Sequence, residues 1–164
     1  MPRRPPLRRL FLAAAALGLA ACTSDPSPAP QASGPVDVPA PSGSAALVVS
    51  ACAALLSALP DELDADVRRR PVSGDAARTA AWGDPPVTLQ CGVPLPGQER
   101  PPLFIDGFPL VTDERGDAVT YTTSDRAVNV SVRVPKSYDE QVYLVQDLIP
   151  LLKKLPSPKA VPGA

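Results

Sequence analysis

Valine alternates strictly with polar residues over positions 128–134. Successive side chains of a β-strand point to opposite faces of a sheet, so this alternation predicts a strand with its valine face on a core and its polar face in water. Pro135 follows the last valine and is expected to end the strand, because proline cannot donate a ladder hydrogen bond.

A pattern with helical spacing covers residues 45–59. Its apolar stripe consists of Val48, Cys52, Leu55, Leu56 and Leu59. These spacings of four, three, one and three residues place the stripe on one side of an α-helix. Ser44 is positioned to cap the start of this helix, and Pro60 to end it.

A second helix is predicted near the C-terminus. Ser137 and Glu140, three residues apart, have the pattern of a capping box. The helix is expected to continue through Val142, Val145 and Ile149. Pro150 is expected to kink or end it, because proline removes a backbone donor.

Four shorter runs separated by turn signals predict further strands. The runs cover residues 87–91, 103–105, 110–113 and 119–123, and the turns cover 83–86, 106–107 and 115–117. A helix, several antiparallel strands and a second helix predict an α+β fold, with a small antiparallel sheet of about four to five strands packed with an N-terminal and a C-terminal helix. We expect one domain over residues 45–155 and a flexible tail over 156–164.

Residues 1–21 resemble a lipoprotein signal peptide. Four arginines precede an apolar run over residues 10–21, which is too short to span a membrane. Arg8 and Arg9, with the apolar residues that follow them, also resemble a twin-arginine export motif, so the export route is left open between the Sec and twin-arginine systems.

The sequence Leu-Ala-Ala-Cys at positions 19–22 matches the bacterial lipobox. It predicts cleavage between Ala21 and Cys22 and attachment of a diacylglycerol to the Cys22 thiol. Because two acyl chains give stable anchoring, the chain is expected at the extracytoplasmic face of the cell membrane. The alternative is an ordinary secretory signal with a coincidental cysteine.

The segment 22–44 begins with the lipidated cysteine and continues with Ser, Pro, Ala and Gly and little charge. Such a composition cannot bury a core, so the segment is predicted to be a disordered spacer.

Charge argues against nucleic-acid binding. The formal net charge is −1, but all four charged residues before Cys22 are arginines, so the mature chain keeps 12 basic and 17 acidic residues. Nucleic-acid binding needs a basic surface and is usually helped by stacking aromatics, whereas Phe, Trp and Tyr make up only 4% of this chain.

Cys52 and Cys91 remain after Cys22 is used for lipid. An even pair of cysteines in an oxidising compartment predicts a structural disulfide, here between positions 39 residues apart. The alternative is a redox pair, but the C-x-x-C spacing is missing.

The chain contains no histidine, which excludes Ser-His and Cys-His mechanisms and removes the commonest zinc ligand. The acidic residues Asp61, Glu62, Asp64 and Asp66 imitate the start of a calcium loop, but Val67 and Ser73 stand where the turn glycine and the bidentate glutamate belong. We therefore predict a solvated acidic turn, no metal and no cofactor. An enzyme based on carboxylates would need residues such as Asp84, Asp106 or Asp125 paired in a cleft.

The stretch Trp-Gly-Asp-Pro-Pro at 82–86 holds the chain's one tryptophan. Trp82 is expected to pack on the disulfide and cap the core while Asp84 closes the turn. The alternative is that Trp82 and Asp84 form a surface for a partner or ligand.

Two stretches carry a resemblance to a known family. One runs from Thr79 to Pro94 and contains Trp-Gly-Asp-Pro-Pro and Cys-Gly, and the other runs from Cys52 to Pro60. Together they resemble a family of actinobacterial lipoproteins known as domain-of-unknown-function family 3515. The resemblance implies an anchored or secreted protein and supplies no catalytic residues.

These observations lead to one preferred function and two alternatives. The preferred one is a non-enzymatic interaction module of the cell envelope, anchored in the membrane, that binds an envelope protein. The alternatives are a domain that binds a small ligand or a cell-wall fragment and, less favoured, a carboxylate-based enzyme.

Overall fold

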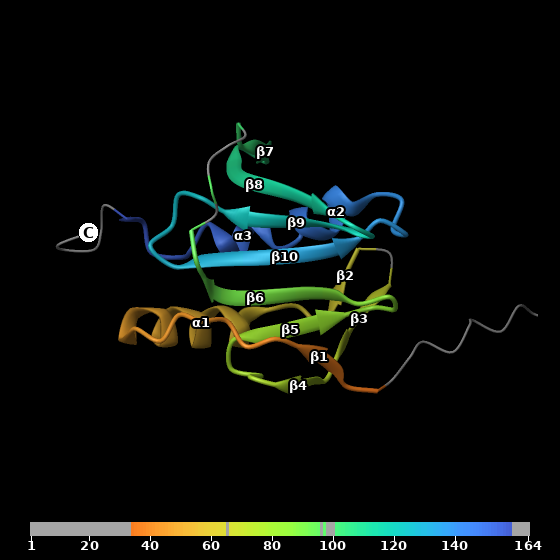
Figure 1. Ribbon diagram of the computed structural model, residues 1–164, viewed down its shortest axis with the longest axis horizontal. Coiled ribbons are helices and arrows are strands. Elements are labelled where there is room, and N and C mark those ends of the chain that lie inside the picture. Colours follow the sequence, from red (N-terminus) through yellow and green to blue (C-terminus); the bar gives the residue numbers. More distant parts are fainter. Residues whose placement is uncertain (1–33, 65, 96, 98–100, 159–164) are drawn as a thin grey trace, which may run out of the picture. The chain divides into compact units, whose positions relative to one another are not determined.

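The computed structural model describes residues 34–64, 66–95, 97 and 101–158. Within these residues the chain forms a mixed α+β fold around a mostly antiparallel sheet (Figure 1). The α+β class predicted from the sequence is therefore confirmed. The sheet is larger than the predicted four to five strands.

The main sheet has eight strands, all paired antiparallel. In spatial order these are β2 (Glu62–Leu63), β3 (Val67–Arg70), β5 (Thr79–Trp82), β6 (Val87–Val93), β10 (Asn129–Pro135), β9 (Ala118–Thr123), β8 (Phe108–Arg115) and β7 (Leu103–Ile105). The predicted strands correspond to β6, β7, β8, β9 and β10. Strands β2, β3 and β5 were not predicted. All four residues of β5 are buried, so this strand shows no alternation.

The valine strand occupies the interior of the sheet as β10. It pairs with β6 on one side and β9 on the other, so Val132 lies between Leu89 and Tyr121. The four alternating valines are all buried. The polar face of this strand was predicted to lie in water, but Ser131 on that face is also buried.

The first predicted helix is α1 (Ala46–Ala58). Leu59, which precedes Pro60, has φ −64° and ψ 141°, the extended conformation that a following proline favours, so the predicted end is confirmed. The predicted cap is wrong. Ala45 occupies the N-cap position, and no side chain forms a capping hydrogen bond there.

The second predicted helix is divided into α2 (Gln141–Gln146) and α3 (Ile149–Leu152). The capping box is not formed, because Glu140 itself occupies the N-cap position and makes no side-chain capping bond. Pro150 stands in the first turn of α3, where a missing backbone donor costs nothing. Pro150 therefore begins a short helix instead of ending a long one.

Residues 34–44, predicted as part of the spacer, contribute to the fold. Strand β1 (Val36–Val38) pairs in parallel with β4 (Val72–Gly74). Val36 and Val38 are buried with Ala81 in a second apolar cluster. The folded unit therefore begins before the predicted boundary at residue 45, and three alternating residues were too short a pattern to reveal it.

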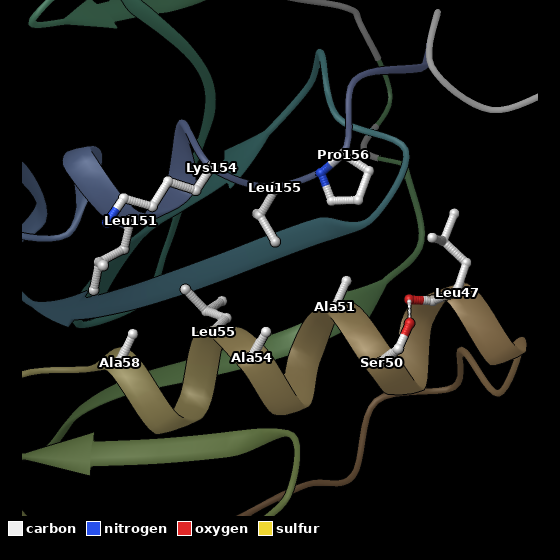
Figure 2. Close-up of a pocket in the computed structure, with 10 residues that line it drawn as sticks. All are labelled: Leu47, Ser50, Ala51, Ala54, Leu55, Ala58, Leu151, Lys154, Leu155 and Pro156. Carbon is white, nitrogen blue, oxygen red and sulfur yellow. Dashed lines mark hydrogen bonds between the residues drawn. The ribbon is translucent and has the colours of Figure 1, made fainter.

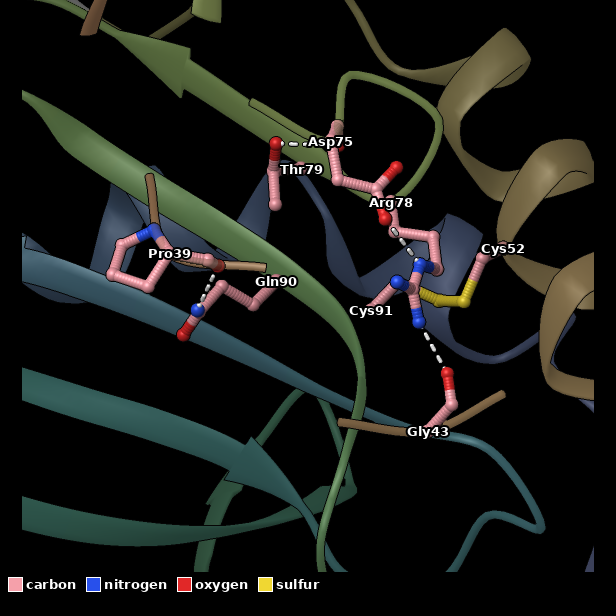
Figure 3. Close-up of polar contacts among 8 residues, drawn as sticks. All are labelled: Pro39, Gly43, Cys52, Asp75, Arg78, Thr79, Gln90 and Cys91. Carbon is pink, nitrogen blue, oxygen red and sulfur yellow. Dashed lines mark hydrogen bonds and ion pairs between the residues drawn. A yellow bond between two sulfur atoms is a disulfide. The ribbon is translucent and has the colours of Figure 1, made fainter. Parts of the chain in front are cut away.

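Polar contacts hold the connection between β1 and α1 against the sheet (Figure 3). The amide of Gln90 donates to the carbonyl of Pro39 at 2.6 Å. The guanidinium of Arg78 donates to the carbonyl of Gly43 and pairs with Asp75 at 2.6 Å. Residues 39–43 are thereby fixed to β6 and to the turn before β5.

The predicted disulfide joins Cys52 of α1 to Cys91 of β6, with a Cα–Cα distance of 5.6 Å. It places α1 on the face of the sheet that carries Leu89 and the β10 valines. Figure 1 shows α1 beside β5 and β6, and α2 and α3 behind β9 and β10. The main core lies between these helices and this face.

Candidate functional site

Trp82, for which a binding surface was the alternative to a place in the core, lies inside the core. Its side chain is 0% exposed, and its indole Nε1 donates a hydrogen bond of 3.0 Å to the carbonyl of Pro60, just after α1. Strand register pairs Trp82 with Val87, which is four residues, or roughly 13 Å, from Cys91 along β6. Trp82 therefore caps the core as expected, but it neither packs on the disulfide nor reaches a surface ligand.

Asp84 belongs to the turn between β5 and β6, and its contacts are structural. Its half-exposed carboxylate lies 3.6 Å from Nη1 of Arg70. The same guanidinium donates to the carbonyls of Gly83 at 2.9 Å and Gly34 at 2.8 Å. The Tyr138 hydroxyl donates to the carbonyl of Pro85 at 2.8 Å, and burial raises the pKa of Tyr138. This turn thus joins β3, the start of β1 and the segment before α2.

The three carboxylates considered for an enzyme do not come together. Asp84 lies at the end of the sheet where β6 begins, whereas Asp106 and Asp125 lie on turns at the other end. Asp106 accepts a hydrogen bond from Gln146 at 3.2 Å. Asp125 pairs with its neighbour Arg126 at 3.5 Å.

The acidic cluster after α1 is spread along a turn and the edge strand β2. Glu62 pairs with Arg68 across β2 and β3 at 3.7 Å. The backbone amide of Asp64 donates to the carboxylate of Asp147 at 2.7 Å. Among the residues that the structure describes, no group of three or more His, Cys, Asp or Glu side chains is arranged to hold a metal ion.

The lipidation site Cys22 and the cleavage site Ala21–Cys22 lie outside the described residues, as do the signal peptide and the first part of the spacer. Within the described part of the chain, no helix is long and apolar enough to cross a membrane.

An apolar groove runs between α1 and the C-terminal helical segment (Figure 2). Its volume is about 310 Å³. The α1 wall consists of Leu47, Ser50, Ala51, Ala54, Leu55 and Ala58, and the opposite wall of Leu151, Lys154, Leu155 and Pro156. Leu55 and Leu155 are buried, while Ala54 and Ala58 are exposed.

The small side chains of α1 leave the groove open. Ala51, Ala54 and Ala58 are spaced by three and four residues, so they share one side of the helix. Figure 2 shows them along α1 with Leu151 and Leu155 on the facing segment. Larger side chains at these positions would fill the space.

Helix α1 has an unusual surface for a helix at the edge of a fold. Its 13 residues include no acidic or basic side chain, although eight of them are exposed. Surface helices normally carry charged residues on the side that faces water. An uncharged exposed helix beside an apolar groove is the kind of surface that binds a ligand or partner.

Lys154 is the one charged residue of the groove lining. Its ammonium group forms no ion pair or hydrogen bond with any described residue. The groove therefore offers an apolar surface and one unpaired cation. None of the described residues that line the groove is a carboxylate.

A second hollow of about 400 Å³ lies between β8, β9 and the start of α2. It is lined by Leu103, Thr112, Glu114, Val119, Tyr121, Lys136 and Gln141. Its charges are already paired, because Lys136 lies 3.5 Å from Glu114. Burial, with a smaller effect of Glu114, raises the pKa of Tyr121.

The groove was not predicted from the sequence. One signal for it was present, because the uncharged sequence of residues 46–58 is visible without a structure. The partner segment was not visible, since α3 was predicted to be the end of a longer helix.

Comparison with known proteins gives a family and no activity. A family model described as "Protein of unknown function (DUF3515)" matches residues 9–159. No curated protein and no solved structure matches the chain.

Proposed function

The chain belongs to the family of proteins of unknown function DUF3515, and we propose that it is an exported, lipid-anchored binding module of the cell envelope whose binding site is the groove between α1 and residues 151–156. The module is non-enzymatic. The observation that carries this proposal is the open apolar groove beside an uncharged exposed helix.

The proposed anchor is the Cys22 thiol, supported by the lipobox at positions 19–22 and the basic and apolar segments before it. Only residues 23–33 separate Cys22 from the first described residue, Gly34. Eleven residues span at most about 40 Å when fully extended. The binding module would therefore work close to the membrane, closer than the predicted spacer implied.

The groove has the properties of a ligand site. Sites for small ligands are concave and mostly apolar, with a few polar groups that set orientation, and their volumes begin at roughly 300 Å³. Here the wall is built of leucine, alanine and proline, and Lys154 and Ser50 are its polar members.

A second candidate function is docking of an envelope protein near β7 and α2. Leu103, Val142 and Tyr143 are 40, 41 and 49% exposed, and Phe104 is 63% exposed. Leu103 and Gln141, which precedes Val142, line the same hollow. Exposed apolar residues of this kind support a protein contact.

Site-specific photocrosslinking in cells tests the groove directly. A benzophenone amino acid replaces Leu47, which lines the groove, or Val49, which is 53% exposed on the same helix but does not line it. We expect ultraviolet light to give a defined adduct from position 47 and none from position 49. Equal adducts, or none from position 47, would overturn the proposal.

The anchor has its own test. The native chain is expected in the membrane fraction. Its mass is expected to include a diacylglycerol on Cys22. Cys22→Ala should lack that mass. An identical lipid-derived mass in both chains would show that Cys22 is not the anchor.

A further inference from the structure

We propose that the groove holds one linear acyl chain of a single-chain anionic lipid, with its headgroup beside Lys154. This inference rests on the proposed function and names its ligand. The lipid is an exchangeable molecule and not the chain's own anchor.

The shape of the groove favours one extended chain. Its α1 wall runs from Leu47 to Ala58, and eleven residues of helix rise about 16.5 Å. A volume of about 310 Å³ along that wall describes an elongated groove, which suits one extended acyl chain.

The composition of the wall favours hydrocarbon. Leu47, Ala51, Ala54 and Ala58 offer no hydrogen-bonding side chain, and the hydroxyl of Ser50 already donates to the carbonyl of Leu47 at 3.1 Å. An extended peptide would find few hydrogen-bonding side chains on this wall for its amide and carbonyl groups, whereas an acyl chain has no such groups.

Charge sets the orientation. Lys154 is the one charged lining residue, and its ammonium has no acidic partner among the described residues. The ammonium of the neighbouring Lys153 already has a partner, because it donates a hydrogen bond to the carbonyl of Asp106 at 2.9 Å. A carboxylate or phosphate at the end of the acyl chain would pair with Lys154.

The test uses the full chain, extracted from its membrane and exchanged into an amphipathic polymer. The probe is palmitic acid with a photoreactive diazirine in its chain. We expect saturable labelling of peptides from residues 46–58 and 151–156, competed by unlabelled palmitate. Labelling that does not saturate, or that falls elsewhere, would overturn the inference.

Two variants separate entry into the groove from contact with its surface. Ala54→Phe fills the groove, and Ala53→Phe adds the same side chain at an exposed position of α1 that does not line it. We expect labelling to fall about tenfold in the first, a loss of roughly 1.4 kcal/mol, and to stay unchanged in the second. Equal labelling would overturn the inference. Matching circular dichroism spectra establish that both variants are folded.

A third variant tests the headgroup. Lys154→Gln is expected to weaken labelling by the acid by up to about fivefold, as for an exposed ion pair, and to leave labelling by the corresponding diazirine alcohol unchanged. An equal effect on both probes would show that Lys154 does not bind the headgroup. If position 47 captures a peptide while the fatty acid does not compete, the proposed function stands and the lipid inference fails.

Discussion

Gly83 follows Trp82 in the turn between β5 and β6 and has φ +67°. A Cβ atom at this position would collide with the Tyr138 hydroxyl and would lie 2.7 Å from Cγ1 of Val67. Gly83→Ala therefore combines an unfavourable backbone conformation with overpacking, and we expect the free energy of unfolding to fall by about 2–4 kcal/mol. Urea unfolding measures this change.

Gly107→Ala is the matched control. Gly107 also has a positive φ, +71°, but nothing lies within 4 Å of an added Cβ. Only the backbone cost of about 1 kcal/mol is expected there. Equal losses in the two variants would contradict the close approach of Tyr138 to the turn.

Tyr121 gives a prediction for alkaline pH. Burial and Glu114 raise its pKa in the folded state, whereas the tyrosine of the unfolded chain titrates near its ordinary value of about 10. The raised pKa means that the folded state favours the neutral hydroxyl of Tyr121. The stability that Tyr121 contributes in this way is complete below about pH 10 and is lost as pH rises through the folded-state pKa.

Tyr121→Phe should therefore lose less stability than the native chain when pH is raised from about 9 to 11. Tyr143→Phe, at a half-exposed position, is the control and should follow the native chain. Chemical unfolding at each pH measures the difference. A Tyr121→Phe profile parallel to the native one would contradict a buried hydroxyl at this position.

At the scale of residues, the sequence predicted buried positions better than surface positions. The alternating valines of β10 and the cysteine pair were placed correctly, because each depends on a local period or on covalent chemistry. Trp82 was a candidate for the surface because Gly83 and the prolines specify only the turn. In the fold its indole donates to the carbonyl of Pro60, and the guanidinium of Arg69 lies 5.1 Å from the centre of its ring.

At the scale of elements, β1 is the strand whose presence most changes the predicted boundaries. Val38 is 2% exposed, whereas Asp37 beside it is exposed. We expect Val38→Ala to lower the free energy of unfolding by about 2 kcal/mol and Asp37→Ala to change it by less than about 0.5 kcal/mol. Urea unfolding of the two variants measures both. If Val38→Ala is also neutral, β1 is not part of the fold.

The disulfide joins two elements that are 39 residues apart in sequence. The chain-entropy account gives a contribution of about 4 kcal/mol for a loop of this length. The double variant Cys52→Ala and Cys91→Ala should lose stability of that order. Thiol titration of the purified native chain, without reducing agent, should find neither cysteine free. Two titratable thiols would contradict the bridge.

Helix boundaries were predictable where a proline follows directly and less so elsewhere. Pro60 restricts Leu59 by sterics alone, so the end of α1 was visible in the sequence. Pro150 is compatible both with the end of one helix and with the first turn of another. The chain adopts the second arrangement, with the backbone amides of Leu151 and Leu152 donating to the carbonyl of Leu148 at 3.0 Å each.

At the scale of the whole molecule, the sequence indicated the fold class but not the binding site. The eight-stranded sheet needs β2, β3 and β5, whose pairing is decided by long-range contacts and not by local periodicity. The groove arises because the small residues of α1 face a segment about 100 residues later in the chain. A local sequence pattern cannot show that two segments so far apart in the chain lie side by side.

Native mass spectrometry of the full chain, released from its membrane, tests the central claim most directly. We predict a covalent mass that includes a diacylglycerol on Cys22, together with one bound lipid that is retained by Ala53→Phe and lost by Ala54→Phe. A chain without a bound molecule, or variants that carry the same molecule equally, would contradict the assignment of the groove between α1 and residues 151–156 as the binding site.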